Sequence, residues 1–292
     1  AVDENAHSQE FFDLDHWDDC EDMGEFYRRA QGTSWHNELG DPPVHGSVYV
    51  NNAQDDVIWW NREAQSIYMK FESDANDLIT GTIAGAKAKD GKIYVWTSDG
   101  LFLVDLLLDT RVKFSTAGIN YYEGPILDRN GGNGENLAIA APATRGNSIL
   151  GVAIYRDTYE ADSLGRPLHW LAIWSTSGTS IYNPADNTIL DANFSATGAV
   201  AIDDHGVMAI VTQSTPDVVY ARMIYESSDS WTGVSGFGNL DWHTSGYGSS
   251  DLNWSNTIAI SFVELLDGAS FVTGAMPQVW IGSDNSGIYV GH

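Results

Sequence analysis

A hairpin that recurs along the chain constrains the fold more than any other feature of the sequence. Each copy is a short run rich in Val, Ile, Tyr and Trp, a turn with glycine, and a second such run, as expected for two antiparallel strands. The clear copies and the looser ones are 93–102, 171–182, 279–289, 57–69 and 198–211. Repetition of one hairpin predicts a repeat architecture built of similar small sheets.

An alternating run precedes most of these hairpins and predicts an additional inner strand. The four runs are 80–86, 149–155, 199–202 and 258–263. Gly100 and Gly178 occupy the same turn position and lie 78 residues apart, about two units of the 40-odd residues of a four-stranded blade. The sequence therefore predicts an all-β fold, a β-propeller of about five to seven blades, with 121–141 as a candidate sixth unit. A sandwich or jelly roll is the alternative.

Charge divides the chain into two parts. Residues 1–45 hold 12 acidic and 2 basic side chains, and the Pro42-Pro43 pair ends this segment. We therefore predict an acidic N-terminal arm or docking segment at 1–45, followed by a propeller domain at 46–292. No stretch has the roughly 18 uncharged apolar residues of a membrane helix, so no membrane insertion is expected.

The net charge of −26, from 14 Lys and Arg against 40 Asp and Glu, argues against a nucleic-acid partner because such a surface repels phosphates. It is typical of proteins in salty or divalent-rich media, where cations screen self-repulsion. The single cysteine, Cys20, excludes an internal disulfide framework and a cysteine-based zinc site.

Two phrases of the repeat carry a family resemblance. The run 91–110 and especially Trp280, Gly282, Ser283, Gly287 and Tyr289 resemble the propeller repeats in sensor domains of two-component regulators. Similar repeats occur in structural proteins of marine phages, which are likewise acidic, poor in Lys and rich in Trp. The resemblance implies an architecture and no particular activity.

The sequence lacks the catalytic motifs that would indicate an enzyme. It has no Gly-x-Ser-x-Gly elbow, no phosphate-binding Gly-x-x-x-x-Gly-Lys and no His-Glu-x-x-His helix. We therefore predict no catalytic residues. The sequence favours a non-enzymatic protein over an enzyme but leaves both open. Because the chain has 40 Asp and Glu residues, the sequence does not single out the pair of carboxylates that a glycosidase would use.

The main expectation is that the chain binds no cofactor, and calcium is the only cofactor that the sequence suggests. Asp128, Asn130 and Glu135 offer oxygen ligands in a glycine-rich stretch, although their spacing is too short for an EF-hand. The alternative is an ordinary loop.

One segment has the composition of a recognition loop. The stretch 231–254 interrupts the repeat with residues rich in Gly, Ser, Tyr and Trp, which combine rigid contact area with adaptable hydrogen bonds. Its candidate ligand-binding residues are Trp231, Phe237, Asp241, Trp242, His243, Tyr247 and Trp254. Packing of these aromatic rings between blades is the alternative.

These patterns favour a non-enzymatic propeller that acts as a binding or assembly module, displayed on a virion or outside cells. The first hypothesis is a phage structural protein associated with a tail or fibre, which would explain a chain that starts at Ala1 without Met. The alternatives are a secreted carbohydrate-binding or glycoside-cleaving propeller and a fragment of a sensory ectodomain. Expected partners are other virion or surface proteins or glycans, and a symmetric homo-oligomer is an option.

Two structural expectations complete the sequence analysis. Trp96, Trp174 and Trp280 lie in repeated strands, and we expect each ring to pack between neighbouring blades. The last unit lacks an outer strand, and we expect 46–50 to pair with 286–291 and cover that edge.

Overall fold

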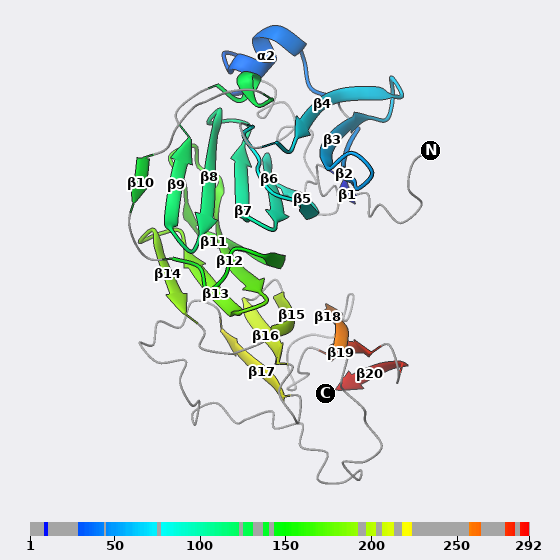
Figure 1. Cartoon of the computed structure of the whole chain (residues 1–292), viewed down its shortest axis with the longest axis vertical. Helices are drawn as coiled ribbons and strands as arrows, with labels where there is room; N and C mark the ends of the chain where they lie inside the picture. Colours follow the sequence, from blue (N-terminus) through cyan, green and yellow to red (C-terminus); the bar gives the residue numbers. More distant parts are fainter. Residues whose placement is uncertain are drawn as a thin grey trace. The chain divides into compact units, whose positions relative to one another are not determined.

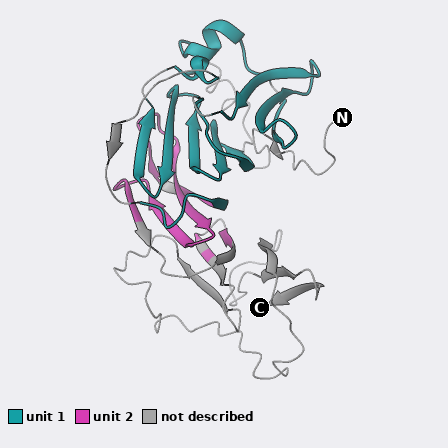
Figure 2. Ribbon diagram, in the orientation of Figure 1, with its two compact units in different colours: residues 1–150 teal, residues 151–292 magenta. Residues whose placement is uncertain are grey.

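The computed structural model is all-β and consists of antiparallel sheets. The structure describes residues 9–10, 29–43, 45–74, 77–122, 125–130, 137–139, 143–191, 197–202, 206–212, 218–223, 257–263, 278–283 and 287–291. The chain divides into two compact units, 1–150 and 151–292 (Figure 2). None of the described helices has the length and apolar character needed to cross a membrane.

The first unit contains two sheets, whose strands follow one another in chain order (Figure 1). The first sheet has the order β1-β2-β3-β4, with strands β1 (Gln9–Glu10), β2 (Gly46–Asn51), β3 (Asp56–Asn61) and β4 (Ser66–Glu72). The second sheet runs from β5 to β10, with strands β5 (Ile83–Lys89), β6 (Lys92–Thr97), β7 (Gly100–Asp105), β8 (Thr110–Ser115), β9 (Gly118–Tyr122) and β10 (Leu137–Ile139). The described part of this unit also contains the short helix α2 (Ser34–Leu39) and the 3-10 helix η2 (Ile126–Asp128).

The second unit contains the remaining three sheets, each again a meander (Figure 1). The third sheet is formed by β11 (Ile149–Ala161), β12 (Pro167–Ser175), β13 (Gly178–Asn183) and β14 (Thr188–Asp191). The fourth is formed by β15 (Thr197–Ile202), β16 (Val207–Thr212) and β17 (Val218–Met223). The fifth is formed by β18 (Thr257–Val263), β19 (Gln278–Ser283) and β20 (Gly287–Gly291).

All five predicted hairpins are present, as are the strands expected before them. The turn residues Ser98-Asp99 join β6 to β7, and Thr176-Ser177 joins β12 to β13. The looser copies form the β3–β4 and β15–β16 hairpins. The expected sixth unit at 121–141 does not form a sheet of its own among the described residues, because β9 and β10 extend the second sheet instead.

The sheets share a backbone irregularity that shows their equivalence. In the second, fourth and fifth sheets, a register shift after the first residue of the first strand leaves one residue bulged: Ala84, Gly198 and Ile258. The next residue is Gly85, Ala199 or Ala259, and each pairs with the residue before the end of the second strand. A bulge at the same place in three sheets indicates that these sheets are copies of one structural unit.

A buried hydroxyl closes three of the tight hairpins in the same way. The last residue before the turn accepts a hydrogen bond from the backbone N–H two residues later and donates to the glycine carbonyl. The hydroxyls belong to Thr97, Ser115 and Ser175, with Oγ-to-carbonyl distances of 3.3, 3.4 and 3.1 Å. The glycines that follow have φ of 149°, 109° and 131°, which a side chain would strain.

Residues from the predicted arm belong to the core of the first unit. Trp35 on α2 is fully buried, and its Nε1 donates to the carbonyl oxygen of Leu106 over 2.8 Å. Ser34 donates from its N–H and its hydroxyl to the carboxylate of Asp109. The described part of 1–45 therefore docks on the sheets, and the domain boundary at residue 45 stays a prediction.

The expected pairing of 46–50 with 286–291 is wrong. β2 pairs with β1 on one side, where Gln9 lies opposite Val48, and with β3 on the other. β2 therefore has partners on both edges within the first unit, β3 along its whole length and β1 at Ser47 and Val48.

The repeated tryptophans meet their expectation only in part. Trp174 packs against a cluster of residues from the third and fourth sheets, including Tyr155 and Met208, as expected. Trp96 is half-buried and lies over Gly85 of its own sheet. The backbone register places Gly282, and not Trp280, at the position of Trp96, because Gly282 pairs with Ala259 after the bulge.

Candidate functional site

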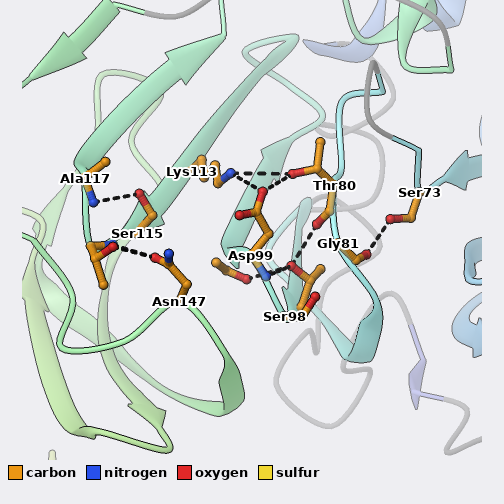
Figure 3. Close-up of polar contacts among 12 residues, drawn as sticks. Ser73, Thr80, Gly81, Ser98, Asp99, Lys113, Ser115, Ala117 and Asn147 are labelled. Atoms are coloured by element: carbon orange, nitrogen blue, oxygen red, sulfur yellow. Dashed lines mark hydrogen bonds and ion pairs between the residues drawn. The ribbon is translucent and has the colours of Figure 1, made fainter.

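A group of polar side chains that we call the polar rim lies at the hairpin tips of the second sheet and includes side chains of neighbouring segments. Figure 3 shows Thr80, Ser98, Asp99, Lys113 and Asn147, and Thr116, which is bound to Asn147, completes the group. β6 and β8 are alternate strands of an antiparallel sheet and run in the same direction, so their tips lie at the same edge. Loops held by a rigid sheet in this way are the usual place for binding residues.

The centre of the rim is the carboxylate of Asp99, which lies between two donors (Figure 3). Lys113 Nζ is 2.5 Å from Asp99 Oδ2, and the Thr80 hydroxyl donates to the same oxygen. The backbone is fixed as well, because Ser98 N donates to the Thr82 carbonyl and Thr82 N donates to Ser98 Oγ, both over 2.9 Å. The β6–β7 tip is thereby tied to the chain that leads into β5.

The second tip, between β8 and β9, is held by the segment before β11. Asn147 Oδ1 accepts hydrogen bonds from Thr116 N over 2.8 Å and from Thr116 Oγ1 over 2.9 Å. Thr144 N donates to the Ser115 carbonyl over 3.0 Å. The amide oxygen of Asn147 is thus engaged, while its side chain is exposed at the rim.

Electrostatics keep Asp99 ionised. Burial would raise its pKa, but hydrogen bonds from Lys113 and Thr80 and the Lys113 charge outweigh this and lower the pKa below its ordinary value. The Asp99 side chain is 44% exposed and the Lys113 side chain 19%, so the carboxylate faces solvent. A fixed carboxylate beside hydroxyl and amide groups can accept and donate hydrogen bonds to a polar ligand.

A second polar group, which we call the carboxylate cluster, lies at one end of the first sheet. It consists of Asp55, Asp56, Lys70 and Glu72. Lys70 Nζ forms an ion pair with Glu72 and lies 3.8 Å from Asp56 Oδ2. The Asp56 side chain is only 4% exposed, and its Oδ2 has no hydrogen-bond partner. Burial, followed by the charges of Glu72 and Asp55, outweighs Lys70 and raises the Asp56 pKa.

A turn after β9 clamps β4 beside this cluster. The Asn130 amide donates to the Lys70 carbonyl over 3.1 Å and accepts from Glu72 N over 2.9 Å, so it replaces one peptide unit of a neighbouring strand. Arg129 Nε donates to the same Lys70 carbonyl over 2.7 Å, and its guanidinium lies over the Phe71 ring. Burial lowers the Arg129 pKa against the raising effects of Glu38, Glu72 and Tyr68.

The predicted calcium ligands are only partly described. Asp128 ends η2 and Asn130 forms the clamp, so the oxygen of Asn130 already accepts a backbone hydrogen bond. Glu135 lies outside the described residues. Within the described ranges, no three His, Cys, Asp or Glu side chains are grouped as a metal site would require.

The predicted recognition residues all lie in 224–256, outside the described residues: Trp231, Phe237, Asp241, Trp242, His243, Tyr247 and Trp254. In chain order this stretch connects β17 of the fourth sheet to β18 of the fifth.

Sequence reasoning missed both polar groups. The rim has a sequence signal, because Asp99 occupies the turn of a clear repeat and Lys113 lies three residues before Thr116, the first residue of the next hairpin turn. Alignment of β3 with β6 could also have indicated Asp56, because Asp56 is the first residue of β3 and the first residue of β6 is Lys92. No local signal indicates that Asn130 reaches β4, because 58 residues separate it from Glu72.

Comparison with known proteins gives only distant structural likeness. No protein-family model matches the chain. No curated protein matches its sequence. Among solved structures, Hsv2 of Kluyveromyces lactis aligns with a TM-score of 0.37 and 9% identity over 85% of this chain and 81% of that chain. Hsv2 of K. marxianus aligns with a TM-score of 0.33 and 12% identity over 66% of this chain and 61% of that one.

The extracellular domain of a proposed one-component system from B. thetaiotaomicron aligns with a TM-score of 0.35 and 13% identity. The alignment covers 84% of this chain and only 31% of that protein. At TM-scores this low, these similarities carry no argument about activity, ligand or partner.

Proposed function

We propose that the chain is a non-enzymatic binding and assembly module with a β-propeller architecture, displayed outside cells. The observation that carries this proposal is the polar rim, where Asp99 and Asn147 are fixed by neighbouring residues yet exposed. Preorganised polar groups on a rigid sheet bind a partner with little ordering cost.

The repeated sheets support the propeller part of the proposal. A bulge at the start of the first strand and a small residue directly after it recur in three sheets, and these sheets have strands in chain order. Blades of a propeller are equivalent meander sheets of this kind. A ring of them offers one face of hairpin tips, to which the rim would belong.

The composition of the aromatic segment 231–254 supports recognition as a role of the chain. Trp and Tyr rings supply large contact area, and they suit both the apolar faces of sugars and flat protein surfaces. The specific role that we propose first is a structural component of a phage virion. Glycan binding is the second candidate, and the same aromatic composition favours it.

The experiment that tests the virion role is mass spectrometry of particles purified from the native source. We expect the chain in the particles at a copy number that matches a symmetry of the virion. Recovery of the chain only in the particle-free supernatant would contradict this role.

A glycan array with the full chain tests the second candidate and the recognition surface. We expect Trp242→Ala and Asp99→Asn each to weaken any binding at least tenfold. Leu108→Ala serves as the control, since Leu108 is an exposed apolar side chain outside both the rim and 231–254. Equal loss in all three variants would contradict a role for the rim and the aromatic segment.

A further inference from the structure

The carboxylate cluster holds more negative than positive charge, and one of its carboxylates, that of Asp56, is buried. Asp56 lies directly opposite Glu72 on the neighbouring strand, and Asp55 is its neighbour along the chain. The one ammonium group among them, Lys70, is ion-paired with Glu72 and more distant from Asp56. Lys70 therefore contacts two carboxylates, and the more buried of them, that of Asp56, receives the more distant contact.

In the second sheet, the two residues at the corresponding positions carry opposite charges. Lys92 begins β6 and lies opposite Asp105, the last residue of β7, as Asp56 lies opposite Glu72. The Asp105 carboxylate also accepts hydrogen bonds from the N–H groups of Leu107 and Leu108, each over 3.1 Å. An acid and a base face each other there, whereas two acids face each other in the first sheet. Like charges directly opposite each other destabilise a sheet.

We propose that Asp56 is a proton-binding site, which makes the first sheet more stable in mild acid than at neutral pH. Protonation removes the charge that burial and the two neighbouring acids oppose. Lys70 then neutralises Glu72 alone, and the neutral carboxyl of Asp56 loses its electrostatic cost. The inference does not depend on the proposed function.

The sign of the effect follows from proton linkage. The folded chain holds the Asp56 proton up to a higher pH than the unfolded chain, whose aspartates titrate at about 3.9. The full stability is therefore present below the unfolded pKa and decreases as the pH rises through the folded pKa. An acid with a lowered pKa, such as Asp99, behaves in the opposite way.

The charged groups around Asp56 come from β4 and from the turn between β2 and β3. Lys70 and Glu72 face it from β4, and Asp55 precedes it in the turn after β2. The Asp55 carboxylate accepts a hydrogen bond from Ile83 N over 2.6 Å. Arg129, from the turn after η2, acts on Glu72 and offsets part of its charge.

The direct test is a titration of the full chain labelled with 13C at aspartate carboxyls. We expect the Asp56 signal to titrate above the ordinary value of about 3.9, while Asp99 titrates below it. Titration of Asp56 at or below the ordinary value would overturn the proposal. This measurement uses the unaltered protein and does not depend on any variant folding.

The second test compares Asp56→Asn with the native chain at pH 4 and pH 7. Urea unfolding is followed by a brief deuterium pulse at one fixed pH, and the β3 and β4 peptides report the first sheet. We expect Asp56→Asn to be stabilised relative to the native chain at pH 7, by about tenfold in the unfolding equilibrium per pKa unit. At pH 4 we expect the difference to shrink.

Glu160→Gln is the matched control, because it removes one negative charge from an exposed position on β11. It should leave the first sheet unchanged at both pH values. The proposal fails if Asp56→Asn destabilises the first sheet as much at pH 7 as at pH 4, or if Glu160→Gln stabilises it equally.

Discussion

At the scale of single residues, a tryptophan lying over a glycine is the most specific contact of the repeat. A Cβ added to Gly85 would lie 2.3 Å from the Trp96 ring, and one added to Gly151 would lie 2.2 Å from the Trp174 ring. These distances are far below van der Waals contact, so each glycine is required for close approach of the ring and not for an unusual φ.

We predict that Gly85→Ala lowers the free energy of unfolding by about 1–3 kcal/mol, because the methyl group displaces the Trp96 ring. Denaturant unfolding of the full chain measures the loss. In a Trp96→Ala background the same change should cost much less, which a double-mutant cycle detects. An equal cost in both backgrounds would show that the ring is not the reason for the glycine.

At the scale of elements, buried hydroxyls determine where the tight hairpins turn. We predict that Ser175→Ala costs about 1 kcal/mol, because the Ser177 N–H and the Gly178 carbonyl both lose their partner. Thr176→Ala, at the exposed position of the same turn, is the control and should change the urea midpoint little. Comparable losses in both variants would contradict the proposed role of the hydroxyl.

The edge of β4 depends on the Asn130 clamp. We predict that Asn130→Asp speeds amide exchange in β4, because a carboxylate oxygen replaces the donor to the Lys70 carbonyl and adds a charge near Glu72. Asn147→Asp is a suitable control, since it alters an exposed amide elsewhere in the same unit. Exchange that accelerates in β4 with Asn147→Asp alone would contradict the prediction.

At the scale of the whole molecule, we expect the net charge of −26 to make the stability of the fold depend on salt. We predict that the melting temperature rises between about 10 and 500 mM NaCl, because added ions screen repulsion as the Debye length falls below about 10 Å. Calcium and magnesium salts should act at lower concentrations than NaCl. A melting temperature that stays flat or falls with salt would show that self-repulsion does not limit the fold.

The sequence alone determined the hairpins, the strands that precede them and the all-β class. These features are local: alternation of apolar residues specifies a strand, and a turn with glycine between two such strands specifies a hairpin. The β6–β7 and β12–β13 hairpins therefore lie where the sequence predicts them.

Tertiary structure alone decided the contacts between segments distant in sequence. Trp35 enters the core 71 residues from its partner Leu106, and Asn130 completes the edge of β4. It also decided that Asp56 is buried opposite another acid, because burial and register depend on which strands become neighbours. Local patterns carry no record of such pairings, since the free energy that selects them arises only when the sheets assemble.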